Sequence, residues 1–124
     1  MTEEKIKKIK LYYHSEPFTI PGKKGNYRIT FSGRLTSDHD LIIGHSLCCP
    51  LDNFVKEKGR ARATGRSYSY TEWIASIDLF DEYRSATDDY KKALHLYFID
   101  ECNKIMNDIQ NNKKSIINIL FSHE

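Results

Sequence analysis

Three arginines and two lysines are concentrated in one short stretch of the chain, KEKGRARATGR, residues 56–66. Side chains four apart lie on one face of a helix, so a helical stretch would present these cations on two adjacent faces. They are Lys58, Arg62 and Arg66 on one face and Lys56 and Arg60 on the next. Arginine suits phosphate because its planar fork donates two parallel hydrogen bonds and stays charged at any working pH. The stretch therefore indicates an anion-binding helix, with a solvated basic face as the alternative.

Aromatic side chains follow this basic stretch directly, and one more arginine precedes it. Tyr68, Tyr70 and Trp73 come after the arginines, where a nucleobase could stack on a ring while the arginines hold its phosphates. Arg28 falls on the polar face of an alternating segment, a face open to solvent or to a ligand. The aromatic residues could equally be core or interface residues, so both interpretations stay open.

Catalytic chemistry has weaker support. The chain has no GxSxG, Walker A, GxGxxG or HExxH motif, the signatures of several hydrolases, kinases, Rossmann enzymes and zinc proteases. His45 and His95 lie on mostly apolar segments and are more typical of core or partner-facing histidines than of catalytic bases. Cys48 or Cys49, near a predicted helix start, could have a lowered pKa, but neither has an assigned histidine partner. We therefore expect a binding protein with no catalytic residues and no cofactor.

A metal or disulfide framework is not expected either. The segment SDHD, residues 37–40, could offer two carboxylates and an imidazole to a metal, but a turn uses the same residue types. We favour the turn. Three cysteines, two of them adjacent, give no CxxC spacing and an odd count, which favours reduced thiols in a reducing compartment.

Length and hydropathy bound the protein class. A chain of 124 residues, 40% of them hydrophobic, is long enough for one core and too short for two ordinary domains. We expect a single domain over residues 1–124. The longest apolar runs, such as LIIG and SIINILF, are far shorter than the roughly 20 residues of a membrane span. A soluble, cytoplasmic protein is expected.

The first half of the chain predicts strands and one helix. Period-two alternation predicts strands at residues 9–14, 26–33 and 41–48. A helix is predicted from Pro50 to Thr64, with Pro50 in its first turn and Gly65 at its end. Gly59 and Ala63, four apart, form a small-residue stripe for close packing against the sheet.

The second half predicts mostly helix. Residues 67–83 predict one short helix, and a longer helix begins at Asp88 or Asp89 and ends at the polar NNKK. SIINILF is short and β-branched enough to predict a last strand. The predicted fold is α+β, a small antiparallel sheet of three to four strands packed with two to three helices.

The segment DLIIGHS followed by CCPLDNFVKEKGRARATGR resembles a strand and helix arrangement of small phage-encoded proteins. Cysteine, proline, an acidic residue, phenylalanine and basic residues are followed there by glycine-arginine, alanine and glycine-arginine. Among these proteins the chain is most similar to the first type of Thoeris anti-defence protein, a phage sponge for immune nucleotide signals. The similar core covers about residues 26–66.

The resemblance implies a phage-encoded, non-enzymatic protein that assembles through dimers in the bacterial host cytoplasm. Such a protein sequesters a cyclic ADP-ribose-type signal made by TIR-domain proteins, such as glycocyclic ADP-ribose, without cleaving it. That ligand has a diphosphate, two riboses and an adenine, and chemistry alone suggests residues for each. The candidates are Arg28, Arg60, Arg62 and Arg66 for the diphosphate, Tyr70, Trp73 or Phe98 for the adenine, and Asp100 or Asn103 for the ribose hydroxyls.

An enclosed pocket in so small a chain is most easily formed at a symmetric subunit interface, so a homodimer or a multiple of dimers is expected. Leu96 and Ile99, beside the main apolar stripe of the long helix, offer a pairing surface. Two rival functions remain, a nucleic-acid-binding protein and a phage inhibitor that docks on a host enzyme. The acidic segment from Asp78 to Asp89 argues against a long nucleic-acid track, and neither nucleic acid nor a membrane is an expected partner.

Overall fold

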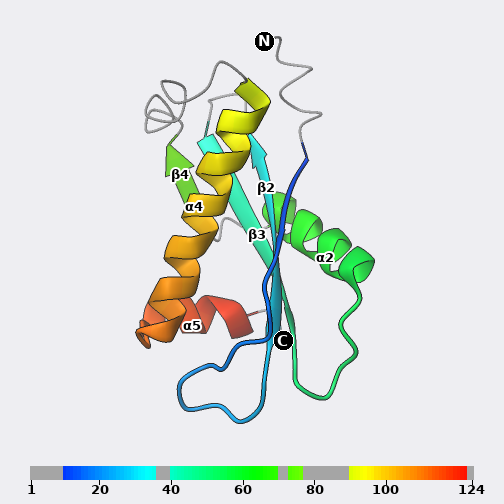
Figure 1. Ribbon diagram of the computed structural model, residues 1–124, viewed down its shortest axis with the longest axis vertical. Coiled ribbons are helices and arrows are strands. Elements are labelled where there is room, and N and C mark those ends of the chain that lie inside the picture. Colours follow the sequence, from blue (N-terminus) through cyan, green and yellow to red (C-terminus); the bar gives the residue numbers. More distant parts are fainter. Residues whose placement is uncertain (1–9, 36–39, 70–72, 77–89, 123–124) are drawn as a thin grey trace.

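The computed structural model describes residues 10–35, 40–69, 73–76 and 90–122. Within these ranges the protein has an α+β fold, with a four-stranded antiparallel sheet in the order β1-β2-β3-β4. The elements in chain order are β1 (Leu11–His14), β2 (Arg28–Leu35), β3 (Asp40–Cys48), α2 (Lys56–Ser69), β4 (Trp73–Ser76), α4 (Tyr90–Gln110) and α5 (Lys114–Phe121). Figure 1 shows α2 on one side of the sheet strands and α4 with α5 on the other side. The predicted α+β fold is confirmed.

The strand register gives the sheet two chemically different faces. On the face toward α4, Phe31 lies between Tyr13 and His45, its partners on the neighbouring strands. This face carries the apolar core, in which Phe31 and Phe98 are fully buried. On the face toward α2, the row directly across three strands is His14, Thr30 and Ser46. The apolar face holds the fold together, and the polar face is left for α2.

Close contact between α2 and the sheet depends on small side chains. Gly59, Ala63 and Ser67, four apart along α2, are all buried. A Cβ atom added at Gly59 would lie 2.5 Å from Thr30 Oγ1, and one added at Gly44 would lie 2.6 Å from the Ser67 backbone nitrogen. The predicted stripe of Gly59 and Ala63 is confirmed. It places the backbone of α2 almost directly on the sheet.

The predicted helix was wrong at both ends. Pro50 lies in a turn, in which the Asp52 backbone N–H donates to the Cys49 carbonyl at 3.0 Å. Proline has a fixed φ, and this φ suits the second position of such a turn as well as the first turn of a helix. Gly65 does not end the helix, because α2 continues to Ser69.

Two other segments adopt the opposite structure to the predicted one. Residues 73–76, within the predicted short helix, form β4 beside β3. SIINILF forms α5 rather than a strand, after α4 ends at a turn in which Asn112 has a φ of 58°. Leu120 of α5 is fully buried in the core. Tertiary burial therefore overrides the β-propensity of this segment. The long predicted helix is confirmed as α4, while its predicted caps at Asp88 and Asp89 lie outside the described residues.

His45 is a core residue of the sheet's apolar face. The side chain is fully buried, its Nε2 atom lies 3.0 Å from the Leu120 carbonyl oxygen, and Trp73 packs edge-on against its ring. His45 therefore contacts the core rather than a ligand in the cleft. Within the described ranges, the helices lack the combination of length and apolar character that crossing a membrane requires.

Replacing Gly44 by alanine tests the close approach of α2. The added methyl group would collide with the α2 backbone at Ala63 and Ser67, so we expect a loss of about 1–3 kcal/mol in unfolding free energy. Urea denaturation followed by circular dichroism measures it. Gly65→Ala is the matched control, because a Cβ there meets nothing within 4 Å and should stabilise the helix by about 0.5–1 kcal/mol. Equal effects of the two substitutions would contradict the proposed contact.

Candidate anion-binding cleft

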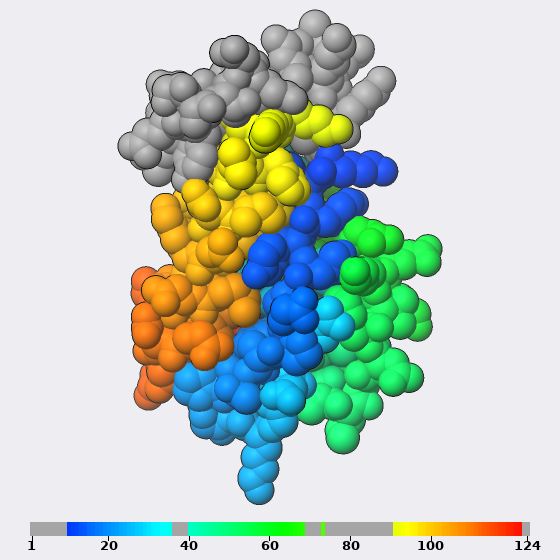
Figure 2. Space-filling model, in the orientation of Figure 1, coloured from blue at the N-terminus to red at the C-terminus, as the bar shows by residue number. Residues whose placement is uncertain are grey.

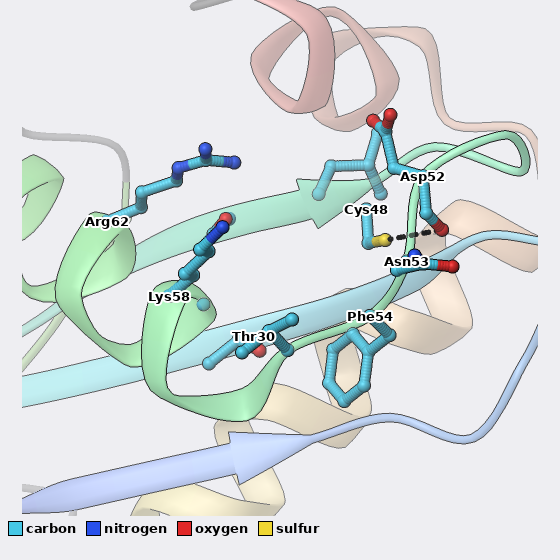
Figure 3. A pocket seen from close by; sticks show the side chains of 11 residues that line it. Thr30, Cys48, Asp52, Asn53, Phe54, Lys58 and Arg62 are labelled. Atoms are coloured by element: carbon cyan, nitrogen blue, oxygen red, sulfur yellow. Dashed lines mark hydrogen bonds between the residues drawn. The ribbon is translucent and has the colours of Figure 1, made fainter.

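A cleft of about 370 Å³ opens on the polar face of the sheet, where α2 begins. Its floor is formed by the cross-strand pair Thr30 and Ser46 with Cys48 beyond it. The loop before α2 forms one wall and the first turns of α2 form the other, as Figure 3 shows. The residues that line it are Thr30, Ser46, Leu47, Cys48, Asp52, Asn53, Phe54, Val55, Lys58, Gly59 and Arg62.

Lys58 and Arg62 provide the cationic side of the cleft. They lie one turn apart on α2, and both side chains are exposed. Figure 3 shows them on the same wall, facing the loop that carries Asp52 and Asn53. Asp52 is the one carboxylate among the lining residues, so the two cations outnumber it. The predicted sharing of one helix face is confirmed for this pair, and the cleft favours an anion.

Neutral hydrogen-bonding groups add to the cations. Ser46 lines the cleft and is 6% exposed, whereas the Thr30 hydroxyl is fully buried and hydrogen-bonded to His14 at 2.8 Å. Val55 directly precedes α2, and its carbonyl accepts the Gly59 N–H at 3.0 Å. A valine side chain cannot accept hydrogen bonds from the first N–H groups of a helix as a serine or aspartate would. The helix start is therefore chemically suited to an anion's oxygen atoms.

The thiol of Cys48 is not activated by this setting. Burial raises the pKa of Cys48, and the neighbouring Asp52 carboxylate raises it further, while Arg28 and Arg62 oppose the shift. Its Sγ donates weakly to the Asp52 backbone oxygen at 3.5 Å. The sequence-based possibility of a lowered pKa at Cys48 is therefore wrong, because carboxylate and burial outweigh the arginines. Cys48, Cys49 and Cys102 all lie within the described ranges, and none of them forms a disulfide there.

The predicted arginines have different roles. Arg62 lines the cleft. Arg28 lies at its edge, with its guanidinium 3.8 Å from the centroid of the Phe54 ring and its Nε donating to the Ser15 carbonyl. Arg60 lies over Tyr12, 5.8 Å from the ring centroid. Arg66 Nη1 donates to the His45 carbonyl at 3.0 Å. His45 follows residues 40–43 of β3, the part of that strand that pairs with β4. Arg60 and Arg66 thus pack α2 onto the sheet.

The predicted ligand residues of the second half lie away from the cleft. Phe98 is fully buried in the core beside Gly33, so the expectation that it stacks on a base is wrong. Trp73 is on the apolar face and packs edge-on against Phe31, with the two ring centroids 5.7 Å apart. Asp100 and Asn103 are exposed on α4, in the layer opposite α2. Within one chain the sheet separates Trp73, Asp100 and Asn103 from Arg62. Tyr70 lies outside the described residues.

Sequence reasoning did not select several cleft residues. The alternation of Arg28, Thr30 and Ser32 marked a polar strand face and could have identified Thr30. Helical spacing already places Lys58 on one face with Arg62, but from the sequence only the arginines are assigned to the diphosphate. Asn53 carried no signal, because its place depends on the turn at Pro50 that the sequence did not reveal.

Comparisons with known proteins do not decide among the possible ligands. No family model, curated protein or solved structure matches the chain. Over the described ranges, no group of three or more His, Cys, Asp or Glu side chains is arranged to hold a metal ion.

Alanine substitutions should separate the cleft arginine from the packing arginine. Arg66→Ala removes a donor from the carbonyl of fully buried His45 and should lower the unfolding free energy by about 1–3 kcal/mol. Arg62→Ala, on the same helix, removes an exposed side chain and should change it by less than about 0.5 kcal/mol. Urea denaturation of both variants measures the difference. If Arg62→Ala were the more destabilising change, the assignment of the two roles would be reversed.

Proposed function

We propose that this protein is a non-enzymatic binding protein that holds a small phosphate-bearing ligand in the cleft at the start of α2. The observation that carries the proposal is that Lys58 and Arg62 line the same cleft as Ser46, whose side chain is 6% exposed. Phosphate oxygens accept hydrogen bonds from an ammonium, a guanidinium and a serine hydroxyl. Small-ligand pockets commonly enclose roughly 300–1,000 Å³, and this cleft, at about 370 Å³, falls at the lower end of that range.

The ligand class we propose is a cyclic ADP-ribose-type nucleotide, and its capture would serve a phage against TIR-dependent Thoeris immunity. The sequence resemblance suggests this ligand class, and the cations Lys58 and Arg62 of the cleft support it because they suit a diphosphate. The position of the adenine differs from the sequence-based expectation. Phe54 is the aromatic residue that lines the cleft, and Arg28 already covers one face of its ring at 3.8 Å. A base would therefore contact the part of the Phe54 ring that Arg28 leaves uncovered, or a second subunit.

Binding without turnover agrees with the chemistry of the cleft. Its thiol, on Cys48, has a raised pKa, which leaves little thiolate for nucleophilic attack. The fully buried Thr30 hydroxyl is already hydrogen-bonded to His14. These groups support retention of the ligand more than its cleavage.

A homodimer would enclose this open cleft. Leu51 is 99% exposed and Val55 is 42% exposed, and both belong to the loop that forms the cleft wall. A second shallow groove, lined by Cys49, Pro50 and Leu51, shares Asp52 with the cleft. Apolar side chains exposed beside a polar site are typical of an interface. We propose that the second copy packs here, rather than on the surface around Leu96 and Ile99.

The two candidate pairing surfaces can be compared directly. Leu51→Asp should convert the dimer to a monomer, because it places a charge in the apolar contact. Leu96→Asp, at a 43% exposed position on α4, is the matched control and should leave the dimer intact. Light scattering after size-exclusion chromatography gives the mass of each variant. A dimer lost only with Leu96→Asp would move the interface to α4, and a monomeric wild-type protein would remove the dimer proposal.

Ligand retention tests the proposed function. We would incubate the purified protein with cyclic ADP-ribose isomers, remove unbound ligand, heat the protein and identify what is released by mass spectrometry. Intact ligand is expected. Lys58→Ala and Arg62→Ala should each weaken retention by about 10- to 100-fold, the loss of one charge-assisted hydrogen bond. Lys104→Ala on α4 removes the same charge from the opposite layer and should retain ligand normally.

The other outcomes identify the rival functions. Release of a cleaved product would indicate an enzyme. No retention, together with binding to plain DNA or RNA that falls steeply with salt, would indicate a nucleic-acid-binding protein. Loss of retention with Lys104→Ala alone would place the ligand on α4 and contradict the assignment of the cleft.

A further inference from the structure

The two walls of the cleft have opposite chemistry. Lys58 and Arg62 lie on the helix wall, and Asp52 and Asn53 lie on the loop wall across from them, as Figure 3 shows. All four residues are exposed, so a ligand in the cleft can reach each of them. The helix wall offers two cations, while the loop wall offers a carboxylate and a side-chain amide.

The opposite charges of the two walls do not neutralise each other. Asp52, Lys58 and Arg62 all lie in the described part of the chain, and the carboxylate forms an ion pair with neither cation. Asp52 takes part in the turn through its backbone, whose N–H donates to the Cys49 carbonyl and whose oxygen accepts from Cys48 Sγ. The carboxylate is therefore not needed by the turn, and a ligand can lie between it and the cations.

The thiol of Cys48, which lines the cleft, is subject to the charges of both walls. Burial raises the pKa of this thiol, the Asp52 carboxylate raises it further, and Arg28 and Arg62 lower it. A phosphate is negative, as a thiolate is, so Asp52 repels it and Arg62 attracts it. A bound phosphate therefore lies against the helix wall, and a different part of the ligand faces Asp52.

The group that faces Asp52 has to be a donor. An ionised carboxylate can only accept hydrogen bonds, and the Asn53 amide can both accept and donate. Adjacent sugar hydroxyls match this pair, and a carboxylate accepts from a ribose hydroxyl in the same way in dinucleotide-binding folds. An ammonium group would also donate to Asp52, but Lys58 and Arg62 would repel it.

We propose that the cleft recognises a ribose 5-phosphate unit, with its phosphate on Lys58 and Arg62 and its adjacent hydroxyls on Asp52 and Asn53. This inference rests on the proposed function of the cleft and adds a sugar specificity to it. Each half of an ADP-ribose-type nucleotide contains this unit. The contacts to the ribose hydroxyls thus move from α4, where the sequence-based expectation put them, to the loop before α2.

Two sugar phosphates that differ by one hydroxyl group test this specificity. The ¹⁵N-labelled protein is titrated with ribose 5-phosphate and with 2-deoxyribose 5-phosphate, and the changes in amide chemical shift give both dissociation constants. At pH 8 both ligands are above the second phosphate ionisation near pH 6, so they carry the same charge. We expect ribose 5-phosphate to bind about tenfold more tightly, which corresponds to one hydrogen bond to a charged acceptor.

Two carboxylate variants assign the preference to its residue. Asp52→Ala should abolish the preference for ribose and should not weaken the binding of inorganic phosphate, because it also removes a repulsive charge. Glu57→Ala is the matched control, since Glu57 is an exposed carboxylate in the first turn of α2 that does not line the cleft. It should change the affinities for both sugar phosphates equally and keep the tenfold preference.

The failure of this inference differs from the failure of the proposed function. Equal binding of the two sugar phosphates, or a preference that persists in Asp52→Ala, would overturn the sugar specificity and leave the anion site in place. Selective binding of ribose 5-phosphate without any binding of ADP-ribose would support the sugar specificity and contradict the proposed nucleotide ligand. Absence of binding of the sugar phosphates, inorganic phosphate and ADP-ribose alike would overturn both.

Discussion

The rest of the structure depends on how closely α2 approaches the strands β2 and β3. Helices usually pack on sheets through large apolar side chains, but α2 meets this sheet through Gly59, Ala63 and Ser67, opposite Gly44. The contact adds little apolar area and permits hydrogen bonds between layers, such as that of 2.9 Å between Ser32 and Thr64. Because the backbone of α2 lies so close to the sheet, the side chains of its first turns reach the ends of the strands. The cleft is the direct result of this geometry.

The two faces of the sheet differ in chemistry and in what packs against them. The face toward α4 and α5 holds the aromatic and aliphatic core, with Phe31 and Phe98 fully buried. The face toward α2 carries the polar row of His14, Thr30 and Ser46 across three strands. A polar face is costly unless its groups are hydrogen-bonded. The hydrogen bonds between His14 and Thr30 and between Ser32 and Thr64 satisfy part of this face. Lys58 and Arg62, in the first turns of α2, are exposed.

Sequence reasoning predicted the fold class, the three earlier strands, the long helix and the contact made by Gly59, because these follow from periodicity and residue size. It failed at Pro50, whose fixed φ suits a turn as well as a helix start, and at α5, where burial of Leu120 decides between helix and strand. It placed Arg62 on the same helix face as Lys58, where both line the cleft, because helical spacing is a local property. It wrongly joined Phe98 to the site because no local pattern tells which face of the sheet a distant helix will cover.

The most direct measurement of the central claim is the map of amide chemical shifts that change when ADP-ribose is added to the ¹⁵N-labelled protein. If the cleft at the start of α2 binds the diphosphate, the largest changes will fall on Thr30, Ser46 and residues 53–62, with those of α4 nearly unchanged. Changes centred on Asp100 and Asn103 of α4, with none at Lys58 or Arg62, would contradict the account.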